Sequence, residues 1–494
     1  MVVGFHNTVE EKKQIKEMLF NSFEFLIFLP TVFLLYWLVF QKNINAQNLF
    51  LLAVSYLFYA WWDWKFLSLV ILCSAMNYVA GLVLGSSESQ KTRKLTLIIS
   101  CVFSLGLLGV FKYFNFFIDN FINVFSLIGI HLHARTLNII LPIGISFYTF
   151  KALSYTIDIY QKKLDPTKDV AAFFCFVGFF PQLLAGPIDR ATTLLPQFYK
   201  QRTFEYDKAV DGMRQILWGF FKKIVIADNC ATAVNTIFAN YETMPASALV
   251  LGAVFFSFQI YADFSGYSDI AIGTARLFGF SSMRNFSVPY FSRDIAEFWR
   301  RWHISLTSWF RDYLYIPLGG NRGTKYQVIR NTFIIFLVCG FWHGANWTFI
   351  FWGFINALYF LPLLLLGKNR KNMDIVAQGK TLPSIKELLQ MGTTFVLATL
   401  AWIFFRADSI GQAFSYIGNI FSKSLIAAPH GSGARLILPQ LVIMVIVEWL
   451  QREKAHGLED LKMHPVLRWI VYLIICILCI ANYQLAQKFI YFKF

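Results

Sequence analysis

Residues 342–347 read Trp-His-Gly-Ala-Asn-Trp, and they place an ionisable imidazole between two strongly apolar runs, 333–338 and 349–352. A segment this hydrophobic can lie in a bilayer, where ionisable side chains are costly and are usually kept for function. A second histidine, His303, ends the sequence Glu-Phe-Trp-Arg-Arg-Trp-His at residues 297–303. Two histidines in aromatic surroundings predict proton-transfer chemistry at a buried site of a membrane protein.

Composition indicates an all-α polytopic membrane protein. Of the 494 residues, 57% are hydrophobic and 15% are charged, which excludes an ordinary soluble protein. The apolar runs are long and continuous rather than alternating, so they predict transmembrane helices. A span needs about 20 residues. Candidate cores, some of them too short or too broken to cross fully, lie at 25–40, 48–62, 66–85, 95–117, 137–157, 170–186, 212–229, 247–262, 328–341, 345–366, 387–405, 434–450 and 466–482.

The net charge of +16 does not predict a nucleic-acid partner. Lys and Arg crowd the cytoplasmic loops of membrane proteins and contact anionic lipid, and no nucleic-acid-binding motif accompanies the charge. The seven cysteines lie mostly in apolar runs, so they do not predict a disulfide framework. Cys476 and Cys479 have the spacing of a redox motif, but the Ile and Leu between them favour a pair in a helix core.

Loop charges predict the orientation in the membrane. Basic residues concentrate in loops 41–47, 86–94 and 160–168, which are therefore expected in the cytoplasm, with the N-terminus outside. The segment 170–186 is followed by another basic loop, and Pro181, Gly186 and Pro187 suit broken backbone, so it is expected to be re-entrant.

Two regions are expected along the chain. Residues 1–21 form an N-terminal extension, with Met18 as a candidate natural start. Residues 22–494 form a single integral-membrane domain.

Residues 284–330 form a charged segment in which aromatic residues alternate with arginines. They predict short amphipathic helices at the cytoplasmic interface, with Glu297 and Arg301 at helical i,i+4 spacing. Trp299, Arg300 and Arg301 are candidates for the entrance of an anionic acyl donor such as a CoA thioester, because arginine suits phosphate. A basic patch facing lipid and solvent explains the segment equally well.

The neighbours of His343 favour a functional role over that of an ordinary core histidine. Gly344 leaves room for a substrate, Asn346 can orient the ring or an acyl carbonyl, and Trp342 offers a flat wall that excludes water. A zinc site is disfavoured because neither His343 nor His303 has a third ligand at suitable spacing, and no metal is predicted.

Residues 261–269 insert polar groups into another apolar run. Asp263, Tyr267, Ser268 and Asp269 are candidate substrate-binding residues. Two carboxylates at membrane depth need partners, and Arg276 is the nearby candidate. A structural hydrogen-bond network deserves equal weight.

Together these residues resemble the membrane-bound O-acyltransferase family, and above all its bacterial branch that contains the membrane subunit of alginate O-acetylation and the D-alanyl transfer protein of teichoic acids. The matching motifs lie at 141–150, 180–188, 261–269, 297–303, 312–320, 342–347 and 402–407.

The resemblance implies about eleven tilted transmembrane helices around a central funnel, with the motif core at 141–407 and with His343 and His303 as catalytic residues. It implies a donor that is acetyl-CoA or another acyl thioester and no tightly bound cofactor. It also implies a polysaccharide whose hydroxyls receive the acyl group, an extracytoplasmic serine-hydrolase-like partner, and the bacterial cytoplasmic (inner) membrane as location. D-alanyl transfer from a carrier-protein thioester, and an acyl channel without chemistry, remain alternatives.

A cytoplasmic donor and an external polysaccharide can meet only where protein thins the bilayer. We therefore expect a cavity that opens near Trp299 and Arg300, narrows at His343 and is also lined by His303.

Overall fold

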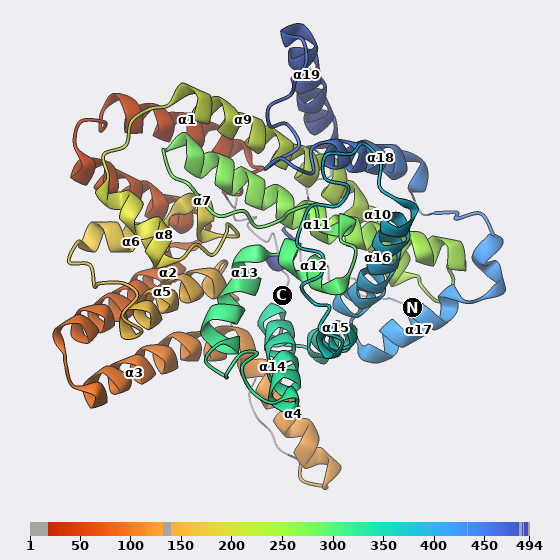
Figure 1. Ribbon diagram of the computed structural model, residues 1–494, viewed down its shortest axis with the longest axis horizontal. Helices are drawn as coiled ribbons and strands as arrows, with labels where there is room; N and C mark the ends of the chain where they lie inside the picture. The colour runs from red at the N-terminus through yellow and green to blue at the C-terminus, as the bar shows by residue number, and fades with distance from the viewer. Residues whose placement is uncertain (1–17, 132–139, 432, 484–486, 488, 493–494) are drawn as a thin grey trace, which may run out of the picture.

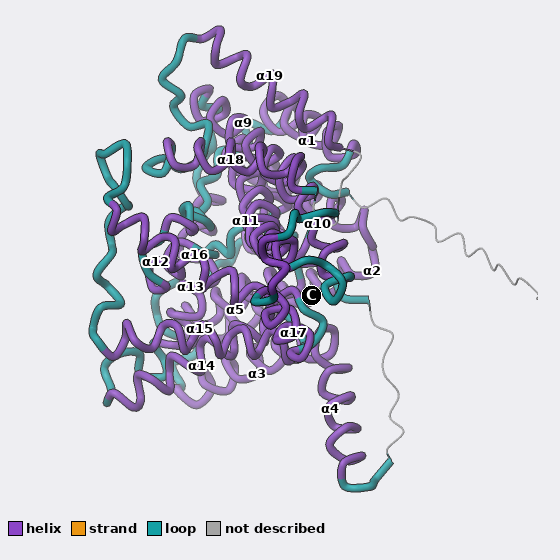
Figure 2. Tube along the Cα trace, turned by 90° about the vertical axis from the view of Figure 1, so that its right-hand side faces the viewer, coloured by secondary structure: helices purple, strands orange, loops and turns teal. Residues whose placement is uncertain are grey.

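The computed structural model describes residues 18–131, 140–431, 433–483, 487 and 489–492. Within these ranges every regular element is a helix, and no strand occurs (Figures 1 and 2). The predicted all-α class is therefore confirmed for the described part of the chain.

The helices follow one another in chain order as α1 (Phe23–Leu38), α2 (Ile44–Ser86), α3 (Gln90–Leu108), α4 (Phe114–Leu127), α5 (Ile145–Tyr160), α6 (Val170–Gly178), α7 (Phe180–Leu183), α8 (Ala191–Leu194), α9 (Tyr206–Phe220), α10 (Asp228–Ala239), α11 (Ala246–Leu277), α12 (Ile295–Arg301), α13 (Ile304–Phe310), α14 (Lys325–His343), α15 (Trp347–Leu365), α16 (Ile385–Arg406), α17 (Ile410–Ile420), α18 (Ala434–Leu450) and α19 (Pro465–Asn482). Three π-helical segments join neighbouring helices: η1 (Gly109–Tyr113), η3 (Phe221–Ala227) and η5 (Arg311–Tyr315). Short 3-10 segments are η2 (Leu195–Tyr199), η4 (Pro289–Phe291), η6 (Lys423–Ile426) and η8 (Ile490–Phe492).

Six of the described helices are long and apolar enough to cross a membrane: Ile44–Ser86, Gln90–Leu127, Ala246–Leu277, Trp347–Leu365, Ile385–Arg406 and Pro465–Asn482. This supports an integral membrane protein, but it does not confirm about eleven transmembrane helices. The helix Ile44–Ser86 bends at Asp63, whose φ of −158° and ψ of 112° are not helical. The bend separates the two apolar cores that the sequence predicts on either side of it.

The segment 170–183 is enclosed by protein. It forms the short helices α6 and α7, and nearly all of its side chains from Ala172 onward are buried. At about 1.5 Å per residue, neither helix is long enough to cross the hydrocarbon core. This agrees with the predicted re-entrant segment, because broken helices at membrane depth are tolerated where protein surrounds them.

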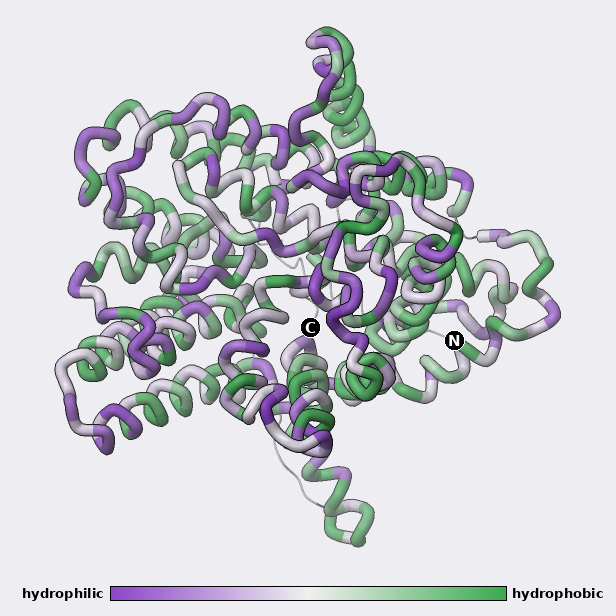
Figure 3. Tube along the Cα trace, in the orientation of Figure 1, coloured by the Kyte–Doolittle hydropathy of each residue, from purple (hydrophilic) through white to green (hydrophobic). Residues whose placement is uncertain are grey.

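Two helices at the ends of the molecule lie largely outside the packed body. α4 and α19 project in opposite directions in Figure 1, and apolar residues dominate both in Figure 3. None of the described side chains of α4 is buried, and in α19 only Ile475 is. Their exposed apolar surfaces suit contact with lipid.

The charged segment folds as predicted into the short helices α12 and α13, followed by η5. Its centre, however, is buried: Glu297 is 1% exposed, Arg293 8% and Arg301 8%. The alternative of a basic patch facing lipid and solvent is therefore wrong for these arginines. Glu297 binds both, since Arg301 Nη2 lies 2.8 Å from its Oε1 and Arg293 Nε lies 3.0 Å from its Oε2, and Asp374 gives Arg293 a second carboxylate at 2.9 Å.

Close packing of α9 against α11 brings charged groups together inside the molecule. Gly219 faces the carbonyl of Gly266, and Gly266 faces the carbonyl of Gly219, so a Cβ on either would collide with backbone. Small residues at such crossings let two helices approach closely in a membrane. Because α9 and α11 lie so close, the segment η3, which directly follows α9, packs alongside the middle of α11.

We expect Gly219→Val to force α9 and α11 apart and to destabilise the protein by at least about 1–3 kcal/mol, as overpacking does. Thermal unfolding of the purified protein in detergent measures the change. Gly392→Val is the matched control, because Gly392 is a helical glycine of α16 with no atom within 4 Å of an added Cβ. Equal midpoints for Gly219→Val and the control would show that the crossing tolerates a side chain.

Candidate functional site

His343 is the last residue of α14, and its ring is buried among aromatic side chains. It is 3% exposed, and its ring centroid lies 5.2 Å from Trp352, 5.3 Å from Phe405 and 5.6 Å from Tyr491. The helix ends at Gly344, where a side chain would collide with the ring of Phe349. The space beside Gly344 is therefore filled by Phe349. The prediction that Gly344 leaves room for a substrate is wrong.

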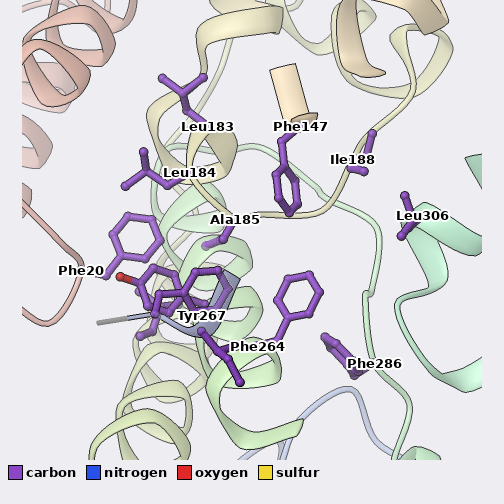
Figure 4. Close-up of a cluster of buried hydrophobic side chains, with 14 of the residues drawn as sticks. Phe20, Phe147, Leu183, Leu184, Ala185, Ile188, Phe264, Tyr267, Phe286 and Leu306 are labelled. Atoms are coloured by element: carbon purple, nitrogen blue, oxygen red, sulfur yellow. The ribbon is translucent and has the colours of Figure 1, made fainter. Parts of the chain in front are cut away.

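His303 lies between α12 and α13 and is 1% exposed. Its ring lies 4.5 Å from Phe264, 6.4 Å from Phe147 and 6.3 Å from Phe286, measured between centroids. Figure 4 shows these three phenylalanines gathering from separate segments of the chain. On the polar side, His303 Nδ1 is 3.0 Å from Asn285 Oδ1.

Trp342 joins the two histidines in one aromatic cluster. Its ring lies 6.1 Å from His303 and 5.0 Å from His343. Lys112 holds this end of α14, because its Nζ donates to the carbonyls of Trp342 at 2.7 Å and of His343 at 3.1 Å. The two histidines therefore share one packed centre, although they are 40 positions apart in the sequence.

Two cavities lie beside this centre. One, called the inner cavity after the cytoplasmic side on which the donor is expected, is rich in charged side chains and is lined by Lys222, Tyr261, Asp269, Arg284, Glu448 and His456 among others. The other, called the outer cavity, is lined by residues 141–147, Lys112, Leu184, Trp342 and Tyr491. Phe286 lines the inner cavity and Phe147 lines the outer one, so the phenylalanines packed around His303 reach both cavities.

The predicted cavity is wrong in two respects. Neither of these cavities is lined by Trp299 or Arg300, where the entrance was expected, and neither is lined by His343 or His303, which lie in the packed aromatic wall beside them. Trp299 packs between Phe336 and Trp352, each 5.5 Å away. Arg300 donates to the carbonyls of Asn369 and Asn372, at 2.7 and 2.6 Å.

Arg301 also binds the loop that follows α15. Its guanidinium binds Glu297 and donates to the carbonyl of Asp374 at 3.0 Å. Arg293 donates to the side chain of Asp374, and this hydrogen bond holds the pKa of that carboxyl below its ordinary value. The arginines of α12 thus have partners within the protein, and a role in donor binding stays a prediction.

Asn346 has a local partner as well. Its Oδ1 accepts from the backbone N–H of Thr348 at 2.9 Å, which makes it the N-cap of α15. An asparagine in this position satisfies one of the free N–H groups at the start of the helix. Contact of Asn346 with the His343 ring or with a substrate stays a prediction.

The carboxylates of residues 261–269 find lysines rather than arginine. Asp263 Oδ1 lies 2.8 Å from Lys223 Nζ, and Asp269 Oδ2 lies 2.6 Å from Lys222 Nζ. Arg276, the predicted partner, pairs with Asp211 instead. The polar residues do not interrupt the helix, because α11 runs continuously through them.

Of the other two predicted residues in this stretch, Ser268 lines the inner cavity and accepts a hydrogen bond from Asn285 Nδ2 at 3.0 Å. Tyr267 packs 5.3 Å from Phe20 and 4.3 Å from Phe489, and it lines neither cavity.

The C-terminal segment 489–491 enters the centre, which the sequence did not indicate. The N–H of Ile490 donates to Asp263 Oδ2 at 2.7 Å, and Tyr491 lines the outer cavity beside His343. The one available signal was the density of aromatic residues in this short stretch after the last predicted span.

Comparison with known proteins identifies the family of this chain. Residues 56–395 match the model of MBOAT, the membrane-bound O-acyltransferase family. The chain belongs to the membrane-bound O-acyltransferase family. It is therefore an O-acyltransferase of the membrane, and the resemblance seen in its sequence motifs is confirmed.

Three relatives of this O-acyltransferase cover different shares of the chain. It is 41% identical to the probable alginate O-acetylase AlgI of Pseudomonas aeruginosa, over 82% of this chain and 75% of the relative. It is 34% identical to the peptidoglycan O-acetyltransferase of Helicobacter pylori, over 84% of this chain and 81% of the relative. It is 31% identical to the teichoic acid D-alanyltransferase of Bacillus subtilis, over 45% of this chain and 58% of the relative.

The lysine of η3 gives a prediction about stability. Lys223 lies 2.8 Å from both Asp228 and Asp263, and all three side chains are at most 4% exposed. We expect Lys223→Met to cost about 3–5 kcal/mol, because it leaves buried carboxylates without their cation.

Thermal unfolding in detergent measures this loss. Lys208→Met is the control, since Lys208 pairs with Glu205 at the surface, where a pair contributes about 0–1 kcal/mol. A Lys223→Met protein as stable as the control would contradict the importance of the buried pairs.

Proposed function

We propose that this O-acyltransferase moves an acetyl group from a cytoplasmic thioester to hydroxyls of an extracytoplasmic polysaccharide. The observation that carries the proposal is the pair of buried histidines, packed against Trp342, between a charged cavity and a mostly apolar one. Two relatives named for O-acetylation align with more than four fifths of the chain. The teichoic acid D-alanyltransferase of Bacillus subtilis aligns with less than half.

The inner cavity supplies the properties that a thioester donor needs. Lys222, Arg284 and His456 line it and offer basic groups to the phosphates of a donor such as acetyl-CoA. Asp269 and Glu448 line the same cavity, and Asp269 is the partner of Lys222, so the donor's phosphates would bind by competing with these carboxylates for the basic groups. The aromatic shell beyond the cavity keeps water from the thioester carbonyl.

The reaction is acyl transfer between sulfur and oxygen. The hydroxyl oxygen bonds to the thioester carbonyl carbon while its proton passes to His343, which acts as general base. The carbon–sulfur bond then breaks, and the leaving thiolate takes up the proton from the imidazolium. In this scheme His303 positions one of the two substrates at the same centre. The enzyme needs no bound cofactor for these steps.

The outer cavity is the route to the polysaccharide. It adjoins Trp342 on the side of residues 141–147 and presents a mostly apolar wall, which suits a small acyl group. In the proposed arrangement an extracytoplasmic serine-hydrolase-like partner receives the group there and passes it to the polymer at the bacterial inner membrane.

D-alanyl transfer is the second candidate, because relatives with that activity share part of the chain. The composition of the outer cavity argues against it. Lys112 is the only basic side chain among the residues that line this cavity, and no carboxylate is among them. A D-alanyl group carries an ammonium, which a lysine repels in a medium of low dielectric, whereas acetyl is neutral.

We expect His343→Ala to lower O-acetylation of the cell's surface polysaccharide by about 10²–10⁴-fold, the usual contribution of a general base. Mass analysis of the polymer, with and without the gene, measures the loss and distinguishes acetyl from D-alanyl. His430→Ala is the control, because His430 is exposed and remote from both cavities. If His343→Ala kept half the activity at normal membrane levels, the protein would be a conduit and not the catalyst.

A further inference from the structure

Asn285 is a fully buried residue that binds the His303 segment at several points. It lies in the connection between α11 and α12 and is 0% exposed. Its Oδ1 accepts from the Ser305 hydroxyl at 2.9 Å and from the Ser305 backbone N–H at 3.3 Å, and it lies 3.0 Å from His303 Nδ1. Its Nδ2 donates to Ser268 Oγ at 3.0 Å, and its backbone carbonyl accepts from Ile304 N–H at 2.8 Å.

These hydrogen bonds determine which atom of the Asn285 side-chain amide is the oxygen and which is the nitrogen. A backbone N–H can only donate, so the atom that faces Ser305 N–H must be the amide oxygen. The same oxygen faces His303 Nδ1. Because a carbonyl oxygen only accepts, Nδ1 must carry the hydrogen, and the neutral ring of His303 then has its lone pair on Nε2.

The ring is also held in direction by its backbone. His303 has a φ of 42° and a ψ of 56°, a left-handed conformation that is rare for a residue with a Cβ. The hydrogen bonds from Ile304 and Ser305 to Asn285 fasten the residues directly after it. The turn therefore aims the ring into the cluster formed by Phe147, Phe264 and Trp342.

His303 Nε2 is left without a protein partner at this position. It is buried, and no residue in the described part of the chain forms a hydrogen bond with it. A buried acceptor without a partner is unfavourable, so such a group in a site is suited to a partner that arrives with a substrate. That partner must be a hydrogen-bond donor, because Nε2 offers only a lone pair.

We infer that Asn285 is a positioning residue that fixes His303 as the Nδ1–H tautomer, and that His303 thereby binds the recipient, through a hydroxyl other than the one that gives its proton to His343, and not the acyl donor. This inference rests on the proposed function, which leaves open which substrate His303 serves. A hydroxyl can donate a hydrogen bond to Nε2. The carbonyl oxygen of a thioester only accepts, so it gains nothing from this tautomer.

The first experiment reads the tautomer without any activity. The full-length protein, labelled with ¹⁵N-histidine and purified in detergent, gives ring-nitrogen resonances, and a His303→Gln spectrum assigns those of His303. We expect a protonated Nδ1 and an unprotonated Nε2. We expect the same pattern in Asn285→Asp, because a carboxylate also accepts from Nδ1–H, and a loss of the preference in Asn285→Leu.

Asn77→Leu is the matched control for this measurement. Asn77 is a buried amide that bonds Ser104, Ser100 and Thr156, none of which lines either cavity. The variant therefore loses several buried hydrogen bonds and should leave the His303 resonances unchanged. A proton on Nε2 in the wild type, or an unchanged pattern in Asn285→Leu, overturns the inference.

The second experiment separates the substrates by kinetics. In membranes that contain the extracytoplasmic partner, we expect Asn285→Leu to lower kcat for acetyl transfer to the polysaccharide by about 10²-fold, with the KM for the thioester unchanged. Asn285→Asp should recover most of the loss. A raised KM for the thioester with unchanged kcat would assign His303 to the donor and overturn the inference. If the wild type acetylates no polysaccharide, the proposed function fails, while the spectra still decide the tautomer.

Discussion

Two lysines on η3 meet two carboxylates on α11, at distances of 2.8 and 2.6 Å, inside a protein built mainly of apolar residues. Charges at membrane depth persist only when they are paired, so these contacts determine how α9, η3 and α11 must lie. The glycines at the crossing allow the approach that the pairs require. Asp263 also accepts from Ile490, and Asp269 lines the inner cavity, so both the centre and this cavity depend on this packing.

Aromatic side chains lie between the two cavities in the interior of the protein. Trp342 contacts both histidines, and the phenylalanines around His303 reach one cavity on each side. Rings suit this task because they are large, rigid and unable to bind water strongly. The two histidines therefore lie in a packed aromatic wall beside the two cavities, where water has little access to them.

The two histidines of the candidate site could be picked out from the sequence, because ionisable residues are unusual in apolar or aromatic stretches. His343 and His303 attract notice as ionisable groups in apolar or aromatic sequence, and the structure packs both against Trp342. The partners of such groups were not predictable. Arg276 is near Asp269 in sequence, yet lysines of a preceding helix lie closer in space, since a helix crossing is not visible in local spacing.

The fold was predictable as a class and less so in its parts. Long apolar runs predict helices, but short or tilted helices such as α6 and α7 blur the count of spans. Arg293 and Arg301 read as surface charge because their shared partner, Glu297, binds them inside the folded protein, which the sequence does not show. Asn285 has no distinctive sequence context, and its importance follows from hydrogen bonds that form only in three dimensions.

The position of residues 489–491 bears on how the protein is made. This segment contacts Asp263 and the ring of His343, yet the ribosome reaches it only after all the helices up to α19. Membrane helices are inserted in the order of their synthesis, and the earlier ones pack before the later ones exist. The contacts around Asp263 and His343 are therefore complete only after α19 has been made, when this segment packs against side chains that were synthesised long before it.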